Sequence, residues 1–173
     1  HRMKIYIYDS RTISHGEAVM VLEASKLLNQ GATMPEIITQ ITALRQKMTI
    51  YMTVDNLKTM IRTKRISAPA GFFANLFDIK PIVYLNDSGR IVPFEKVRSF
   101  DKCIRRLAEI VVDEVKGKKG QMYLASGQLN PYIKPLTMHL AQRGYADLPV
   151  MPIASVSLAN IGVFALVVIF IED

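Results

Sequence analysis

The sequence is poor in the residues that build disulfides and zinc sites. Its 173 residues include a single cysteine, Cys103, and no tryptophan. One cysteine cannot close an internal disulfide or build a multi-cysteine zinc site, so we expect a reducing, cytoplasmic setting and no metal site. Cys103 lies on the apolar stripe of an expected helix, and we interpret it as an inert core thiol rather than a nucleophile.

Long hydrophobic runs are also lacking. The longest uninterrupted apolar run covers residues 161–171, and a membrane-spanning helix needs about twenty residues. The run is rich in β-branched and aromatic residues, which favours a buried strand. No charged and apolar leader opens the chain, so we expect neither a secretion signal nor an integral membrane segment.

Common catalytic motifs are missing as well. The sequence has no P-loop, no dinucleotide-binding glycine motif and no zinc-protease motif. Asp9, Ser14 and His15 look like part of a hydrolase site, but neighbours in sequence do not make a triad, and a capping role already explains Ser14. An enzyme that acts on a small anionic substrate through these three residues stays an alternative.

The charge is strongly basic, with 22 lysines and arginines against 15 acidic residues and a net charge of +7. The densest basic stretch runs from Lys96 to Arg106 and is diluted by acidic residues. Nucleic-acid binding, a solvated helix face and a docking surface for an acidic protein are three interpretations of this stretch. No groove-reading motif supports the first of them, so we expect no nucleic-acid partner.

The hydrophobic pattern predicts an α/β protein. Half of the residues are hydrophobic, which excludes intrinsic disorder. Capping-box spacings at Ser14–Glu17 and Thr33–Glu36 predict two helix starts, and residues 86–89 have the chemistry of a hairpin turn. We expect strands at 4–8, 49–53, 80–85, 90–94, 122–125, 150–156 and 163–171, and helices at 14–29, 33–48, 55–61, 72–77, 99–115 and 132–142.

A cation and a hydroxyl precede an apolar segment near the middle of the chain. Arg65, Ile66 and Ser67 lead into a stretch that contains Phe72 and Phe73. Such donors beside apolar side chains suit an amphipathic ligand with an anionic head, such as a fatty acid. The alternative is that Arg65 pairs with a carboxylate between domains and that the phenylalanines belong to the core.

The order of these motifs resembles the DegV family of bacterial fatty-acid-binding proteins, which includes the binding subunits of fatty acid kinase. The matching pieces are Tyr8–Ser10 with Ser14 and Gly16, Gly31–Ile37, Thr53–Leu57, Arg65–Ser67, Leu76–Ile82, Asp87 with Gly89, and Lys96–Ser99. Two pieces differ. Thr63 and Lys64 replace the two glycines before the family's arginine, and Asn160 stands where the family has a histidine. Asn160 can donate a hydrogen bond to a carboxylate but adds no positive charge.

The resemblance implies a two-lobed α/β fold with an acyl chain between the lobes. We expect a partial N-terminal lobe with parallel strands and helices at residues 4–52. A second lobe, a mixed sheet with helices, is expected at residues 53–173. Family members are longer, and serine and threonine groups in their N-terminal region hold the fatty-acid carboxylate. The chain therefore resembles one complete lobe with part of another, and a homodimer or domain-swapped pair would supply the missing wall.

The resemblance also implies a carrier without catalysis or cofactor of its own. Such a carrier binds a long-chain fatty acid and presents its carboxylate to a partner kinase, which makes acyl phosphate for phospholipid synthesis. By the resemblance Arg65 lies near the carboxylate and Arg98 contacts the kinase. We expect the lipid-binding residues to be Arg65, Ile66, Ser67, Phe72, Phe73 and Asn160. A ligand-free structural or regulatory fragment is the other alternative.

Overall fold

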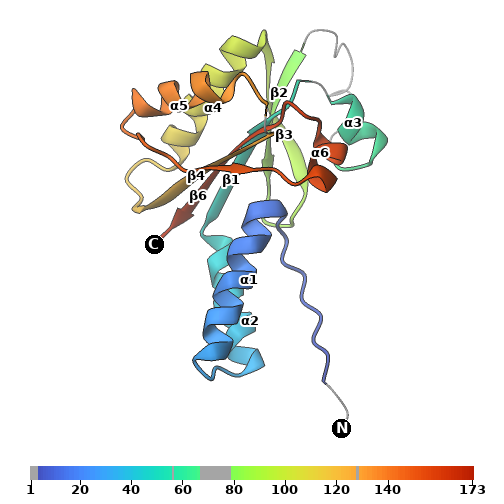
Figure 1. The fold of residues 1–173 in the computed structure, drawn as a ribbon, viewed down its shortest axis with the longest axis vertical. Coiled ribbons are helices and arrows are strands. Elements are labelled where there is room, and N and C mark those ends of the chain that lie inside the picture. Colours follow the sequence, from blue (N-terminus) through green and yellow to red (C-terminus); the bar gives the residue numbers. More distant parts are fainter. Residues whose placement is uncertain (1–3, 56, 67–78, 128) are drawn as a thin grey trace.

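The computed structural model describes residues 4–55, 57–66, 79–127 and 129–173. The order along these ranges is α1-α2-β1-α3-β2-β3-α4-β4-α5-β5-α6-β6 (Figure 1). The helices are α1 (Ser14–Asn29), α2 (Met34–Gln46), α3 (Lys58–Arg62), α4 (Phe100–Glu114), α5 (Ile133–Ala141) and α6 (Ser155–Ile161). The strands are β1 (Met48–Thr53), β2 (Ile79–Leu85), β3 (Ile91–Arg98), β4 (Gly120–Ser126), β5 (Val150–Pro152) and β6 (Leu166–Glu172). The expected helix at 72–77 lies outside the described residues.

The six strands form one mixed sheet in the order β3-β2-β1-β6-β4-β5. This confirms the predicted α/β class with a mixed sheet. β1 is antiparallel to both of its neighbours, β2 and β6, and the parallel pair among the named strands is β4 with β5. The parallel pairing expected for the N-terminal part is therefore found near the C-terminus instead. The lobe boundary between residues 52 and 53 falls at the end of β1 and stays a prediction.

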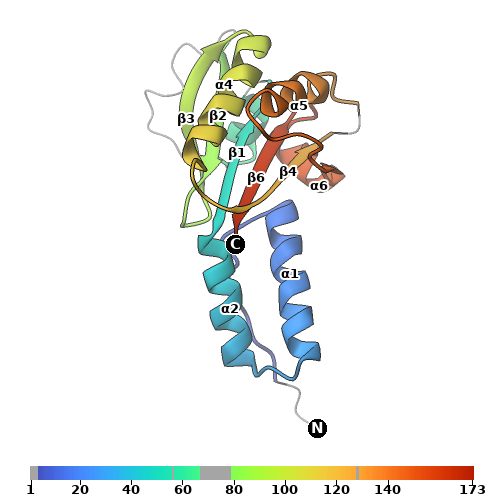
Figure 2. The ribbon, with the colours of Figure 1, turned by 90° about the vertical axis from the view of Figure 1, so that its left-hand side faces the viewer.

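Helices α4 and α5 cover one face of the sheet (Figure 2). The two faces follow from the alternation of side chains along a strand. In β1, Tyr51 belongs to the core beneath α4 and α5, whereas Ile50 and Met52 belong to the core on the opposite face. Leu107 of α4 and Cys103 have no exposed surface, which confirms the predicted apolar stripe and the buried thiol.

The opposite face carries α3 and α6 at one end, and α1 and α2 project beyond the sheet as an antiparallel pair (Figures 1 and 2). Met20 of α1 and Ile41 of α2 are buried in the same core as Ile50. On the projecting part of α1, Leu22 and Leu28 are largely exposed. The sheet thus buries only one end of the helix pair.

Arg45 fastens this helix pair to the sheet from a buried position. Its guanidinium donates to the backbone carbonyls of Arg11 at 2.7 Å, Asn86 at 2.8 Å and Met48 at 3.5 Å. Burial lowers the pKa of Arg45, and the nearby carboxylate of Asp87 opposes that effect. A planar guanidinium with several donors can join the N-terminal segment, the β2–β3 turn and β1 at once.

Two predictions for the N-terminal region are wrong. Residues 4–8 are extended but pair with no described strand, and Ile5 and Ile7 are 78% and 96% exposed. An alternating pattern forms a strand only where a neighbouring strand satisfies its backbone. Ser14 does not cap α1: it has a φ of +53°, and the carboxylate of Glu17 accepts a hydrogen bond from Ser10 instead.

The capping box predicted at Thr33–Glu36 is present. The start of α2 is confirmed, because the Glu36 carboxylate accepts from the backbone N–H and the hydroxyl of Thr33, both at 2.7 Å.

The strand expected at 150–156 ends at Pro152, and α6 follows where no helix was predicted. Seven residues are too few for a clear helical period. None of the helices in the described ranges is both long and apolar enough to cross a bilayer.

Candidate functional site

The sheet face opposite α4 and α5 offers an apolar floor. Ile50 and Met52 of β1 and Val167 and Ile169 of β6 lie on it, because alternate residues of two paired strands share one face. Between this floor, α6 and residues 13–15 lies a cavity of about 20 Å³. That volume is little more than one water requires. The floor is thus suited to an apolar ligand but is nearly closed in this conformation.

A larger cavity of about 280 Å³ adjoins the first and brings Arg65 and Asn160 together. The two cavities share the side chains of Ile13, Ser14, Ser157 and Ile161. The lining of the second cavity includes an exposed cation, an amide, two serines and the carboxylate of Glu17, and four of its residues also border the cavity over the apolar floor. An anionic head and an apolar tail would find matching surroundings along this path.

Local backbone contacts hold the two polar residues. The N–H of Arg65 donates to the carbonyl of Met60 at 2.8 Å, just after α3. The Asn160 side chain donates one amide hydrogen to the carbonyl of Val156 at 2.7 Å within α6. Thr63 donates to the backbone carbonyl of Asn160 at 3.3 Å, which ties α3 to α6. An asparagine amide has a second hydrogen, which leaves a donor for a ligand carboxylate.

His15 and Ser14 lie at the edge of the apolar floor. The Ser14 hydroxyl oxygen is 3.3 Å from Nδ1 of His15, and burial lowers the pKa of His15. Asp9 lines a different cavity, where its carboxylate accepts from the backbone N–H of Arg11 at 3.0 Å. A triad needs an acid that orients the histidine. The structure therefore does not assemble the three residues of the hydrolase alternative.

The other predicted lipid-binding residues have different outcomes. Ile66 pairs with Ile91 in an isolated parallel bridge. Since Ile91 lines the cavity of Arg65 and Asn160, Ile66 lies next to that cavity. No arginine–carboxylate pair across domains involves Arg65 within the described ranges. Ser67, Phe72 and Phe73 lie outside the described residues.

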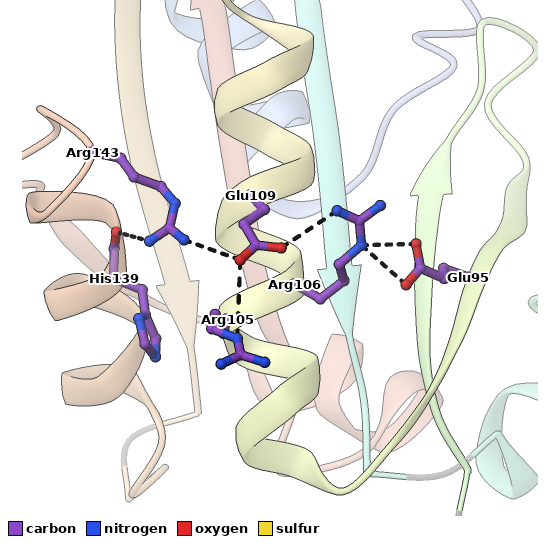
Figure 3. A network of polar contacts seen from close by, with 6 residues as sticks. All are labelled: Glu95, Arg105, Arg106, Glu109, His139 and Arg143. Carbon is purple, nitrogen blue, oxygen red and sulfur yellow. Dashed lines mark hydrogen bonds and ion pairs between the residues drawn. The ribbon is translucent and has the colours of Figure 1, made fainter.

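Arg98, the predicted kinase contact, is exposed at the end of β3, shortly before α4 begins. Next to it, part of the basic stretch is tied into a charged network (Figure 3). Glu109 accepts from Arg143 at 3.1 Å and from Arg106 at 3.4 Å, and Arg106 also donates to Glu95 at 3.0 Å. These pairs join β3, α4 and Arg143 just after α5, so Arg106 links elements of the fold as well as adding surface charge.

Two cations near Arg65 were missed by the sequence analysis. Lys64 and Arg90 line a further cavity of about 370 Å³ on which Arg65 also borders. Arg90 is distant in sequence and arrives there because Ile66 pairs with Ile91. The replacement of a family glycine by Lys64 was the one sequence signal that pointed to this place. No group of three potential metal ligands occurs among the residues the structure describes.

Comparison with known proteins gives a consistent family match. The model of the DegV family matches residues 1–173. A DegV domain-containing protein of Clostridium acetobutylicum is 34% identical over 126 residues, which cover 73% of this chain and 45% of that protein. Protein DegV of Bacillus subtilis is 32% identical over 111 residues, 64% of this chain and 39% of that one. The chain thus spans less than half the length of these curated relatives.

Solved structures share the fold. The fatty acid binding DegV family protein of Streptococcus agalactiae has a TM-score of 0.86 and 24% identity, over 99% of this chain and 61% of that one. A fatty-acid-binding DegV family protein of Thermus thermophilus gives 0.82 and 20%, over 97% and 61%. The Streptococcus pneumoniae Fatty Acid Kinase B3 protein, loaded with linoleic acid, gives 0.74 and 18%, over 98% and 60%.

Proposed function

Because this chain belongs to the DegV family, we propose that it serves as a fatty-acid carrier that presents the ligand carboxylate to a partner kinase. The observation that carries the proposal is the cavity lined by Arg65 and Asn160, which shares four lining residues with the cavity over the apolar floor. The carboxylate would accept from the Arg65 guanidinium and the Asn160 amide, and the acyl chain would lie against Ile50 and Met52.

Burial of the acyl chain supplies the binding energy. Each buried methylene contributes about 0.8 kcal/mol, so ten of them contribute about 8 kcal/mol before the costs of association. The cavity of about 20 Å³ over the floor is too small for such a chain. We therefore expect residues 13–15 to move away from the floor when the ligand enters, since they form the wall opposite Ile50.

The proposed partner is a kinase that binds ATP, and ATP is the phosphoryl donor. A carboxylate oxygen attacks the terminal phosphorus, the bond from that phosphorus to the bridging oxygen breaks, and ADP leaves as acyl phosphate forms. In this proposal Arg98 contacts the kinase from its exposed position on β3, and the carrier contributes no catalytic group of its own. A reducing cytoplasm is the proposed compartment, which suits a chain with one buried thiol.

The solved relatives support the ligand class. The proteins of S. agalactiae and T. thermophilus are described as fatty acid binding, and the S. pneumoniae kinase B3 protein is loaded with linoleic acid. Transfer of this property to the present chain rests on the shared fold and on the residues around Arg65. The proposed function also includes the prediction that the lipid contacts Ile66, Ser67, Phe72 and Phe73.

The test is a binding titration of the delipidated chain with hexadecanoate, together with mass spectrometry of lipid extracted before delipidation. We expect one bound fatty acid per protein chain. Arg65→Gln should weaken binding roughly tenfold, because a charge-assisted hydrogen bond to the carboxylate is lost. Arg62→Gln is the matched control, since Arg62 is an exposed arginine of α3 that lines none of these cavities. A folded chain without extractable or titratable fatty acid would contradict the proposal.

A further inference from the structure

Lys64, Arg65 and Arg90 line one cavity of about 370 Å³ that includes none of the floor residues Ile50, Met52, Val167 and Ile169 in its lining. This basic cavity shares Ile13, Arg65 and Ile91 with the cavity of Asn160. We propose that the basic cavity is a subsite for a phosphoryl group bound as a dianion, as at the end of an acyl phosphate. The inference rests on the proposed function and extends it from the substrate to the phosphorylated product.

Backbone contacts hold the segments that carry two of the cations of the basic cavity. The Ile66–Ile91 bridge sets Arg65 and Arg90 at neighbouring positions of two segments. The Asn86 side chain accepts from the backbone N–H of Arg90 at 2.9 Å and fixes the start of β3. Because these segments are already in place, an anion can bind between them with little rearrangement of the backbone.

Gly89 allows the β2–β3 turn to reach this position. Its φ is +73°, and a Cβ atom there would lie 2.7 Å from the Cα of Arg11. Only a residue without a side chain lets the turn pack so closely on the N-terminal segment. The turn can therefore place the Arg90 side chain at the cavity, next to Arg65.

Lys64 has an unusual backbone conformation for a residue that lines the basic cavity. Its φ of +55° lies in the left-handed region, which is strained for a residue with a side chain. Glycine would adopt this conformation without strain, and the related family motif has glycine here. Lysine instead adds a cation to the lining of the basic cavity. Strained residues of this kind concentrate at functional sites.

Charge matching favours a phosphoryl group over a carboxylate at this place. A carboxylate carries one negative charge, and Arg65 with the Asn160 amide is sufficient for it. A phosphoryl group carries a second charge and more acceptor oxygens, which Lys64 and Arg90 would match. Within the described ranges none of these three cations forms an ion pair with a carboxylate.

The nearest acidic residues do not neutralise the basic cavity. Glu17 lines only the adjoining cavity, where its carboxylate accepts from Ser10. Asp87 belongs to the β2–β3 turn but lines the separate cavity of Arg11 and Arg45. Among the described lining residues the basic cavity therefore has cations and no acid, so its field attracts an anion.

The experiment compares two ligands that differ only in their head group. Pentadecylphosphonate, a stable stand-in for acyl phosphate with the same alkyl chain, and hexadecanoate are titrated into the full chain by calorimetry at a pH near 8.5. We expect the phosphonate to bind roughly tenfold more tightly, because two further charge-assisted contacts become available. Inorganic phosphate is titrated in a third arm, and its displacement of the phosphonate head would show that free phosphate also uses the subsite.

Substitutions then assign the contacts. Lys64→Gly and Arg90→Gln should each weaken phosphonate binding about fivefold and leave hexadecanoate binding within about twofold. Lys64→Gly also relieves the left-handed strain, so it keeps the test valid if Arg90→Gln disturbs folding. Arg62→Gln removes the same charge from an exposed position outside the basic cavity and should change neither affinity.

Each other outcome has a distinct meaning. Hexadecanoate that binds as tightly as the phosphonate would overturn the subsite and leave the carrier proposal standing. An equal loss of phosphonate affinity in Arg62→Gln and Arg90→Gln would assign the effect to net charge, which also overturns the subsite. A folded chain that binds neither ligand would overturn the carrier proposal and the subsite with it.

Discussion

Thr53 shows how a polar side chain is accommodated in the core of this protein. It has no exposed surface, and its hydroxyl donates to the carbonyl of Pro81 at 2.8 Å and lies 3.0 Å from the sulfur of Cys103. Burial raises the pKa of the Cys103 thiol to about 11. The thiol is therefore protonated at neutral pH, as expected of an inert core cysteine.

Thr53→Val tests the value of that hydroxyl. The substitution keeps the shape of the side chain but leaves the buried carbonyl of Pro81 without this donor. We expect the free energy of unfolding to fall by about 1–2 kcal/mol, measured by urea denaturation. Thr39→Val on the exposed face of α2 is the control and should change it by less than about 0.5 kcal/mol. Equal effects of the two substitutions would contradict this role for Thr53.

His15 makes stability depend on pH in a direction set by its burial. Desolvation lowers its pKa in the folded state, whereas an unfolded histidine titrates near pH 6.5. The unfolded chain therefore binds the proton more readily, and stability falls as the pH drops below about 6.5 until it passes the folded pKa. We expect the stability difference between wild type and His15→Gln to shift against wild type between about pH 7.5 and pH 5.

Urea unfolding of both proteins at several pH values measures this difference. The other titratable groups are the same in the two proteins, so their contributions cancel in the comparison. A difference that stays constant over this range would show that His15 titrates alike in the folded and unfolded states.

At the scale of elements, the attachment of the α1–α2 pair depends on Arg45. Arg45→Met keeps a long apolar stem but leaves the carbonyls of Arg11 and Asn86 without their donor. We expect the free energy of unfolding to fall by about 3 kcal/mol, since donors to several buried carbonyls are lost together. Hydrogen exchange should also become faster in α2 than in α4, because the change loosens only the projecting pair.

Gln40→Met is the matched control for Arg45→Met, because Gln40 lies exposed on the same helix. It should leave both the stability and the exchange rates near those of wild type. Faster exchange spread evenly over α2 and α4 in Arg45→Met would instead indicate global destabilisation, without a specific role in fastening the helix pair.

At the scale of the whole molecule, apolar side chains remain uncovered on the N-terminal part. Ile5 and Ile7 are exposed in the extended segment, and Leu22 and Leu28 are exposed on α1. Exposed apolar patches commonly mark surfaces that another chain or domain covers. The chain also spans about 60% of the length of its solved relatives. The homodimer expected from the sequence stays a prediction that these surfaces support.

Size-exclusion chromatography with light scattering tests the homodimer. We expect twice the mass of one chain, and Leu22→Glu to shift the population toward the monomer because it places a charge in the apolar contact. Lys26→Glu, on the same helix but at an exposed charged position, is the control. A monomer at all concentrations, with and without hexadecanoate, would contradict dimerisation.

The sequence by itself determined those elements whose signals are local. The stripe of α4, the Thr33–Glu36 cap and the turn at residues 86–89 each depend on side chains a few positions apart. A helical period, a cap and a turn are stabilised within their own segment, so they can be recognised without the fold. The order of family motifs predicted the DegV fold for the same reason, because it is a property of the chain alone.

The tertiary structure decided which segments meet. Residues 4–8 have a strand pattern but no neighbour to pair with, and Glu17 contacts Ser10 rather than capping with Ser14. Arg65 meets Asn160 through the contact of α3 with α6, and it meets Arg90 through the Ile66–Ile91 bridge. Strand register and helix packing join residues that no local signal relates, so only the folded chain reveals the cavity and its three cations.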